Sequence, residues 1–411
     1  MIAKGKSFLY KKMVLRQLYF SRELSCADLS KQIKKSIPVC NKILEELISD
    51  GFVIESGFGP SSGGRRPLVY SLISDVMYIV SVAMDQFITR IVMMDVQNKY
   101  IMDIEEFDLP LASNASALEI LAERIKKVIQ RSGVETEKIV GIGIGMPGFV
   151  NSQEGINYTY FHNDKDSNEN VVKYINKKLD LPVYIDNDSS LVGLAELKFG
   201  GAQQGENVMV INVGWGIGLG LILNNKLFRG EKGLAGEFSH IPLFINNKLC
   251  GCGKSGCLET EASLAVIIEK AKKGIEEGRL TILNPKLITM EHPESSFEEI
   301  LAAAKRGDKF CVKLFSDAAY DIGRGIAILI HILSPELIIL SGRGSLAGNI
   351  LEVPVWQALN EHCIPRLVAN TKVQSSTLGY DAELIGAAAL VMENFDKSQH
   401  ENLFTKRLTA A

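Results

Sequence analysis

Three of the seven cysteines of the chain lie close together, at Cys250, Cys252 and Cys257, and His240 precedes this cluster by ten residues. Zinc prefers thiolate and imidazole ligands, and three thiolates with one imidazole complete a tetrahedral shell that leaves no position open for water. Glycines surround the sulfur atoms and few apolar residues lie between them, which argues against the alternative of buried cysteines clustered by chance. The pattern predicts a closed, structural zinc site rather than a hydrolytic one.

The sequence also predicts a reducing environment for these thiols. The charged N-terminal segment is not followed by an apolar stretch, so we expect no signal peptide and a cytoplasmic protein. Thiols stay reduced there, and an odd number of cysteines favours metal binding over a disulfide framework. The longest apolar run, residues 325–340, is interrupted by His331 and Ser334–Glu336, so we expect no transmembrane helix and no membrane partner.

Charge is distributed unevenly along the 411 residues. Residues 1–72 carry 12 Lys and Arg against 6 Asp and Glu, whereas the remainder carries 33 against 42. A chain of this length predicts two or three domains. A basic head before an acidic body suits a polyanion such as nucleic acid, although Lys residues on a helix are equally consistent with a solvated surface.

The elements of the head follow from helical spacing, capping residues and a Gly-rich loop. Ser25 with Asp28 predicts one helix start, and Ser36 with Pro38 predicts another. The expected helices and strands are residues 6–20, 26–33, 36–49, 52–55 and 67–70. This order predicts a winged helix-turn-helix domain over residues 1–75, whose third helix enters the major groove of DNA while the hairpin follows the phosphates.

Candidate DNA contacts lie on the third helix and in the hairpin loop. Asn and Lys side chains can reach base edges or phosphate oxygens, and Arg side chains can fork onto phosphates or enter a minor groove. The candidates are Pro38, Val39, Asn41, Lys42, Arg65 and Arg66. The alternatives are a head that only dimerises, and a pair of arginines that only decorates a loop.

From residue 77 onward strands alternate with helices, which predicts an α/β body of two lobes. We expect the first lobe over residues 76–196, completed by 385–400, and the second over 197–384. Ligands in such folds bind at the C-terminal ends of strands, where Asp186–Asp188 lies. A carboxylate there suits a general base toward a hydroxyl group, although capping of the following helix by Asn187 or Asp188 is the simpler local interpretation.

Two specific motifs occur in the body, GEFSH at Gly236–His240 and CGCGKSGCLE at Cys250–Glu259. Through them the chain resembles the ROK family of sugar kinases and sugar-responsive repressors, and the resemblance extends over nearly its whole length. Supporting matches are MPG at 146–148, DNDSSLVGLAE at 186–196, SPELIILSGRG at 334–344, LIGAAAL at 384–390 and, in the head, SGGRRP at 62–67. The head is similar to the winged head of the family's xylose and N-acetylglucosamine repressors, which its plain kinases lack.

The resemblance implies an actin-like, hexokinase-type body of the ribonuclease H-like class that binds a sugar. It implies that Asn187 binds a sugar hydroxyl and that Asp188 is the base of the active kinases. Glu237 and Glu259 hold further hydroxyls, and His240 both ligates zinc and faces the sugar. The zinc site would then hold one wall of the sugar site rigid.

The chain departs from the kinases where these bind ATP. Residues 83–87 read AMDQF in place of the family's D-x-G-G-T phosphate loop, Trp215 replaces a hydroxyl in GWGIG at Gly214–Gly218, and the adenosine-side glycines are altered at Ser341–Gly344. Phosphoryl transfer depends on positioning and charge neutralisation, so we expect no ATP or Mg²⁺ cofactor. Unaided, GWGIG would equally mark a tight strand turn.

The sequence therefore favours a sugar-responsive DNA-binding repressor of carbohydrate genes over its alternative, an ATP-dependent sugar kinase with an added DNA-binding head. Its expected partners are operator DNA and a sugar or sugar phosphate effector. Helix-turn-helix proteins bind paired half-sites as dimers, and the resemblance implies a homodimer or homotetramer. We expect residues 395–411 to be a surface tail.

Overall fold

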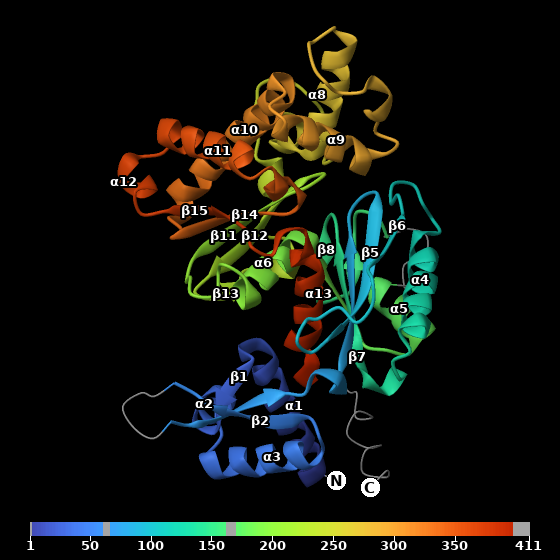
Figure 1. Cartoon of the computed structure of the whole chain (residues 1–411), viewed down its shortest axis with the longest axis vertical. Coiled ribbons are helices and arrows are strands. Elements are labelled where there is room, and N and C mark those ends of the chain that lie inside the picture. The colour runs from blue at the N-terminus through green and yellow to red at the C-terminus, as the bar shows by residue number, and fades with distance from the viewer. Residues whose placement is uncertain (1, 61–65, 162–169, 398–411) are drawn as a thin grey trace. The chain divides into compact units, whose positions relative to one another are not determined.

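The computed structural model of the chain describes residues 2–60, 66–161 and 170–397. The chain forms two compact units (Figure 1). The first contains the chain up to Asn187 together with the segment from Leu384 onward, and the second runs from Asp188 to Glu383. No helix among the described residues is long and apolar enough to cross a membrane.

The first unit begins with the basic head. Its elements are α1 (Ile2–Ser21), β1 (Glu23–Ser25), α2 (Cys26–Ile33), α3 (Ile37–Ser49), β2 (Val53–Phe58) and β3 (Leu68–Leu72). The strands form one sheet in the order β1-β3-β2, and β3 is antiparallel to both neighbours. Apart from β1, which the sequence did not predict, the order of three helices followed by a hairpin is the one predicted from the sequence.

Capping residues decide where the helices of the head begin. Ser25 accepts the backbone N–H of Asp28 at 3.2 Å and caps α2, as predicted. Ser36 is the N-cap residue of α3, as predicted, but its side chain makes no capping hydrogen bond. Helix α3 instead begins with Pro38 in its first turn, where a missing N–H costs nothing.

The rest of the first unit is a five-stranded sheet with helices. Its strands are β4 (Tyr78–Met84), β5 (Ile88–Asp95), β6 (Glu105–Asp108), β7 (Ile139–Met146) and β10 (Val183–Asn187). Its helices are α4 (Ala117–Ser132), α5 (Val171–Leu179) and most of α13 (Ala382–Glu393), and β8 (Val150–Asn151) pairs with β9 (Ile156–Asn157). Helix α13 lies directly against β7: a Cβ at Gly143 would lie 2.0 Å from the backbone oxygen of Ala387, so only glycine fits there.

The second unit is built around another five-stranded sheet. Its strands are β11 (Val208–Val213), β12 (Ile217–Leu223), β13 (Lys226–Leu227), β14 (Leu337–Ser341) and β15 (Lys372–Ser375). Its helices are α6 (Asp188–Phe199), α7 (Glu259–Ala262), α8 (Leu264–Glu276), α9 (Pro293–Lys305), α10 (Lys309–Leu333), α11 (Asn349–His362) and α12 (Pro365–Val368).

The two large sheets share one plan. The strand orders are β6-β5-β4-β7-β10 and β13-β12-β11-β14-β15. In each sheet, the three strands that come first in the chain pair antiparallel with one another in succession. Two later strands then add in parallel on the other side of the first strand. Parallel strands need helical crossovers, and α4 and α10 lie in the corresponding places. The predicted two-lobed α/β body is therefore present as a repeated fold.

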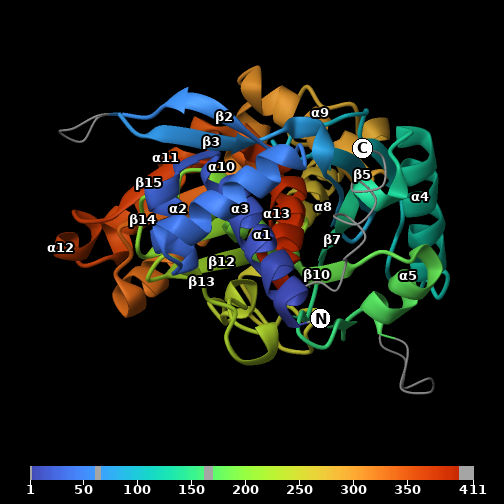
Figure 2. The same cartoon turned by 90° about the horizontal axis from the view of Figure 1, so that it is seen from below.

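The head contacts residues that follow α13. Figure 2 shows α1 close to α13, and beyond α13 Lys12 lies 5.6 Å from the ring centre of Phe395 while Arg16 pairs with Asp396 at 3.1 Å. Phe395 is only 1% exposed. The expectation of a surface tail from residue 395 is thus wrong for Phe395 and Asp396, whereas Lys397 is exposed. Residues 398–411 lie outside the described part.

Candidate functional site

The predicted metal ligands come together in the second unit. The ligand atoms of His240, Cys250, Cys252 and Cys257 all lie within 4.8 Å of one another. The sulfur atoms of Cys252 and Cys257 are 3.7 Å apart, and the sulfur of Cys250 is 3.6 Å from Nδ1 of His240. Zinc–sulfur bonds of about 2.3 Å at tetrahedral angles place two sulfurs roughly 3.8 Å apart, so these four residues fit a zinc ion.

Tight turns place the three cysteines. The amide of Cys250 donates to the oxygen of Lys254 at 2.7 Å, and the amide of Gly253 donates to the oxygen of Cys250 at 2.9 Å. Gly256 has a φ of +77°, and a Cβ there would lie 2.1 Å from the oxygen of Phe244. Only glycine allows this approach, and it brings Cys257 back beside Cys252.

Two of the carboxylates predicted for the sugar site, Glu237 and Glu259, lie beside the metal ligands. Oε2 of Glu237 is 3.8 Å from Nε2 of His240, whose other nitrogen faces the thiols. Burial, together with the charges of Asp188 and Glu259, raises the pKa of Glu237 to about 7. Asp188, Glu237 and Glu259 therefore face one region, and converging carboxylates of this kind accept hydrogen bonds from a ligand with several hydroxyl groups.

Asp188 is held by two residues that are not among the predicted site residues, Ser189 and Asn212. Its Oδ1 accepts the amide of Ser189 at 2.7 Å and the hydroxyl of Ser189 at 3.2 Å. The side-chain amide of Asn212 donates to that hydroxyl at 3.1 Å. Asn212 is the last but one residue of β11, just before the GWGIG turn, and Ser189 follows Asp188 in the chain. Their positions next to candidate site residues are the signal in the sequence that could have identified them.

Asn187 ends the first of the two chain segments that make up the first unit. Its side-chain amide donates to the backbone oxygen of Gly148 at 3.1 Å, and its backbone amide donates to Asp186 at 2.9 Å. Gly148 belongs to the MPG motif and Asn187 to the DNDSSLVGLAE motif, so a hydrogen bond connects two motifs that are far apart in the sequence.

The turn that replaces the kinase phosphate loop is closed on itself. Oδ1 of Asp85 accepts the amides of Phe87 at 2.8 Å and Ile88 at 2.7 Å. The amide of Asp85 donates to the oxygen of Ile88 at 3.0 Å. Backbone amides bind phosphate only when they point at it, and here an internal carboxylate takes two of them.

Around Trp215 the second unit holds a group of side chains that we call the Arg343 cluster. Trp215 and Arg343 are buried, and Glu294 and Tyr380 are half-buried. The guanidinium of Arg343 lies 5.0 Å from the ring centre of Trp215 and 4.3 Å from that of Tyr380. It pairs with the carboxylate of Glu294 and bonds the hydroxyl of Tyr380. Trp215 also packs edge-on against Phe297 at 6.3 Å. The space at the GWGIG turn and at the end of β14, where the sequence departs from the kinases, is thus filled by the chain's own side chains.

The predicted DNA-contacting residues that the structure describes are all exposed. Pro38, Val39, Asn41 and Lys42 lie on α3, and Arg66 precedes β3. Arg65 lies outside the described residues. Ile37, which the sequence analysis did not select, is 51% exposed at the start of α3.

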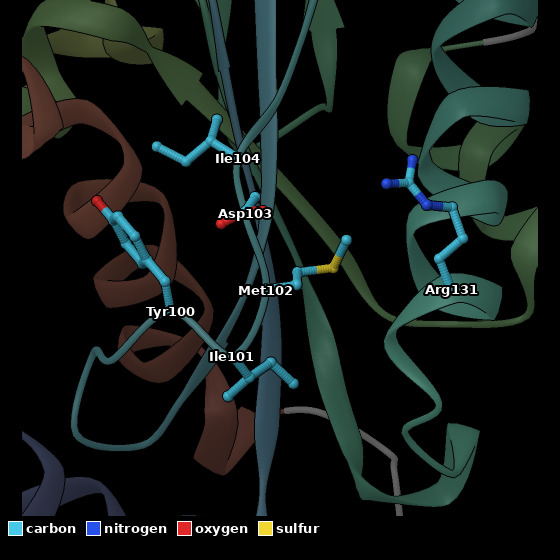
Figure 3. A pocket seen from close by; sticks show the side chains of 6 residues that line it. All are labelled: Tyr100, Ile101, Met102, Asp103, Ile104 and Arg131. Carbon is cyan, nitrogen blue, oxygen red and sulfur yellow. The ribbon is translucent and has the colours of Figure 1, made fainter.

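A separate pocket of about 760 Å³ lies in the first unit (Figure 3). It is lined by Tyr100, Ile101, Met102, Asp103, Ile104 and Arg131. Arg131 comes from α4 and pairs with Glu105. No predicted site residue lines this pocket, so the candidate site remains the carboxylates beside the cysteine cluster.

Comparison with known proteins agrees with this arrangement. The model of the ROK family matches residues 91–394. The xylose repressor of Caldicellulosiruptor bescii is 30% identical over 93% of this chain and 95% of its own. The solved structure of a ROK family transcriptional regulator, a homolog of the E. coli MLC protein, is 26% identical with a TM-score of 0.75, over 99% of this chain and 100% of its own. A ROK family glucokinase from Streptomyces griseus, solved with glucose and AMPPNP, is 25% identical with a TM-score of 0.64, over 76% of this chain and 98% of its own. The chain belongs to the ROK family.

Proposed function

We propose that the chain is a sugar-responsive transcriptional repressor that binds operator DNA with its head and a sugar or sugar derivative with the carboxylates of its second unit. The strongest support for this proposal is the share of the chain that each relative matches. The match to the C. bescii repressor covers 93% of this chain, too much to omit a head of this size, whereas the glucokinase structure covers 76% of the chain.

The proposal assigns a role to each group of residues. Asp188, Glu237 and Glu259 accept hydrogen bonds from sugar hydroxyls, and Asn187 binds a further hydroxyl. His240 and the three cysteines hold a structural zinc ion, which fixes the segment between Glu237 and Glu259. Sugar binding changes the affinity for DNA by a coupling free energy of about 1–3 kcal/mol, in a homodimer or homotetramer on paired half-sites.

A screen tests this function directly. Sugars and sugar phosphates are added to the full chain and the thermal midpoint is followed, because a ligand of the folded state raises it. The sugar that stabilises the protein is then added to a complex of protein and selected duplex DNA, and fluorescence anisotropy is measured. We expect a change in DNA affinity; a protein that binds no duplex at low salt would refute the proposal.

Sugar affinity is expected to fall about 10–100-fold in Glu259→Gln, because a hydrogen bond to a charged group contributes about 1.5–3 kcal/mol. Isothermal titration calorimetry with the sugar found by the screen measures the loss. Glu261→Gln is a matched control two residues away, since Glu261 pairs with Lys270 at 3.2 Å and has no assigned sugar contact. Equal affinities of both variants would remove Glu259 from the site.

The salt dependence of DNA binding is expected to become shallower by about 0.9 in log–log slope in Arg66→Ala, because one phosphate contact is lost. Affinity measured from low to moderate salt gives the slope. Lys313→Ala is the control, since this exposed lysine of the second unit pairs with Asp317. An unchanged slope in Arg66→Ala would exclude the hairpin from the DNA contact.

The second candidate is an ATP-dependent sugar kinase with a DNA-binding head. Asp188 and the likeness to the S. griseus glucokinase favour it, whereas the closed turn at Asp85 and the Arg343 cluster oppose it. A phosphorylation assay over hexoses and amino sugars separates the candidates. Turnover that disappears in Asp188→Asn would establish the kinase.

A further inference from the structure

The start of α3 carries an unusual exposed surface. Ile37 is 51% exposed, Val39 is 39% exposed, and Pro38 between them is also exposed. The opposite face of the helix supplies the core of the head through Cys40, Ile43, Leu44 and Leu47. Single apolar side chains are common on protein surfaces, but here three in succession face outward.

The turn before α3 is fixed by hydrogen bonds. Lys34 adopts the left-handed conformation with a φ of +54°. The hydroxyl of Ser30 donates to the oxygen of Lys35 at 2.6 Å, and the amide of Lys35 donates back to the oxygen of Ser30 at 3.1 Å. The ammonium of Lys35 lies 4.5 Å from the ring centre of Tyr10 on α1. The apolar surface is therefore presented by an ordered segment.

Charged and polar side chains border this surface. Lys34 lies before it and Lys42 follows it, and both are exposed. Asn41 is exposed one turn after Ile37, and Glu45 is exposed one turn after Asn41. The carboxylate of Glu45 repels phosphates, so the first turns of α3 are the part that suits DNA. Apolar groups between two cations fit a partner with an apolar patch between anions.

The major groove of DNA offers one such apolar group, the 5-methyl group of thymine, and it lies between two phosphate backbones. An Asn side chain binds adenine through N6 and N7, with two hydrogen bonds. Thymine methyls and adenine edges occur together wherever T·A pairs adjoin.

We propose that Ile37 and Val39 contact thymine methyl groups and that Asn41 binds a neighbouring adenine, so that each operator half-site contains adjoining T·A pairs read by α3. The inference rests on the proposed function, because it assumes that the head binds DNA. It adds which bases are read, and by which side chains.

Deoxyuridine tests the methyl contact, because it lacks only the 5-methyl group of thymine. Duplexes are first selected from a random pool with the full chain, and thymine is then replaced by deoxyuridine at one position at a time. We expect about a fourfold loss of affinity at one or two positions in each half-site, which corresponds to about 0.8 kcal/mol per methyl group. Replacement elsewhere in the duplex should leave the affinity unchanged.

Two variants connect the effect to α3. Val39→Ala should bind thymine and deoxyuridine duplexes equally at one of those positions, and Asn41→Ala should lose its preference for adenine at the adjoining pair. Ile48→Ala, an exposed apolar residue at the other end of α3 (37% exposed), should keep the wild-type preferences. Alanine favours helix formation at all three positions.

The outcomes separate this inference from the function. If a duplex is selected and bound but deoxyuridine is tolerated at every position, the methyl contact is refuted while the repressor stands. The methyl contact is also refuted if deoxyuridine lowers the DNA affinity of Val39→Ala at every position by as much as it lowers that of the wild type. If no duplex is selected from the pool, DNA binding itself is refuted, and the inference with it.

Discussion

Cys252→Ser is expected to lose its zinc and to disorder the segment between Glu237 and Glu259, while the rest of the chain stays folded. Structural zinc binds with about 10–16 kcal/mol in isolated finger peptides, so the loss of one thiolate removes the main constraint on a segment made mostly of turns. Elemental analysis should fall from about one zinc per chain to none. Limited proteolysis should reveal new cleavage between residues 241 and 258.

The second readout of this variant is sugar binding. Glu237 and Glu259 flank the cysteine cluster, so both lose their fixed positions when the cluster opens. Cys26→Ser is the matched control, because Cys26 is a half-buried thiol of α2 outside the cluster, and it should keep its zinc and its sugar affinity. A wild-type protein without zinc, or a Cys252→Ser protein that retains it, would refute the metal site.

Arg343→Ala is expected to destabilise the protein by about 3 kcal/mol. Arg343 is 4% exposed and pairs with Glu294, and removal of one partner of a buried ion pair costs about 3–5 kcal/mol because the other charge stays unpaired. We take the lower end because Glu294 retains 27% exposure. Urea unfolding followed by circular dichroism measures the change in the free energy of unfolding.

A double variant separates charge from packing. Arg343→Met with Glu294→Gln removes both charges and keeps volume between Trp215 and Tyr380, so it should recover more than half of the loss. Lys313→Ala, which breaks the exposed pair with Asp317, should change the free energy of unfolding by less than about 0.5 kcal/mol. If Arg343→Ala proves as stable as the wild type, the Arg343 cluster does not hold α9 to the end of β14.

The sequence predicted those parts of the site whose chemistry depends on residue type and short spacing. The cysteine cluster is one, because thiolates and glycines within eight residues leave few other roles. The exposed start of α3 is another, because the pattern of buried positions on one helix decides which residues face outward. Both depend on local structure, which spacing along the chain describes well.

Other parts could not be predicted because they depend on residues far apart in the chain. The sequence indicated that Trp215 alters a phosphate motif, but nothing in it connected Trp215 to Arg343, Glu294 and Tyr380, which come from separate elements. At Asp85 the sequence indicated only missing glycines, whereas the structure has a carboxylate bound to the turn's own amides. The buried Phe395 was missed although it continues the spacing of Val391 and Met392 on α13.

The attachment of the head has a consequence for exchanging heads between relatives. Besides the contacts of Lys12 and Arg16 with Phe395 and Asp396, the hydroxyl of Tyr19 bonds the side chain of Asn98 at 2.5 Å. A chimera joined only near residue 75 therefore places a foreign α1 on surfaces that belong to the recipient. A working hybrid requires three stretches from one parent: the head, the turn containing Asn98, and the residues that follow α13.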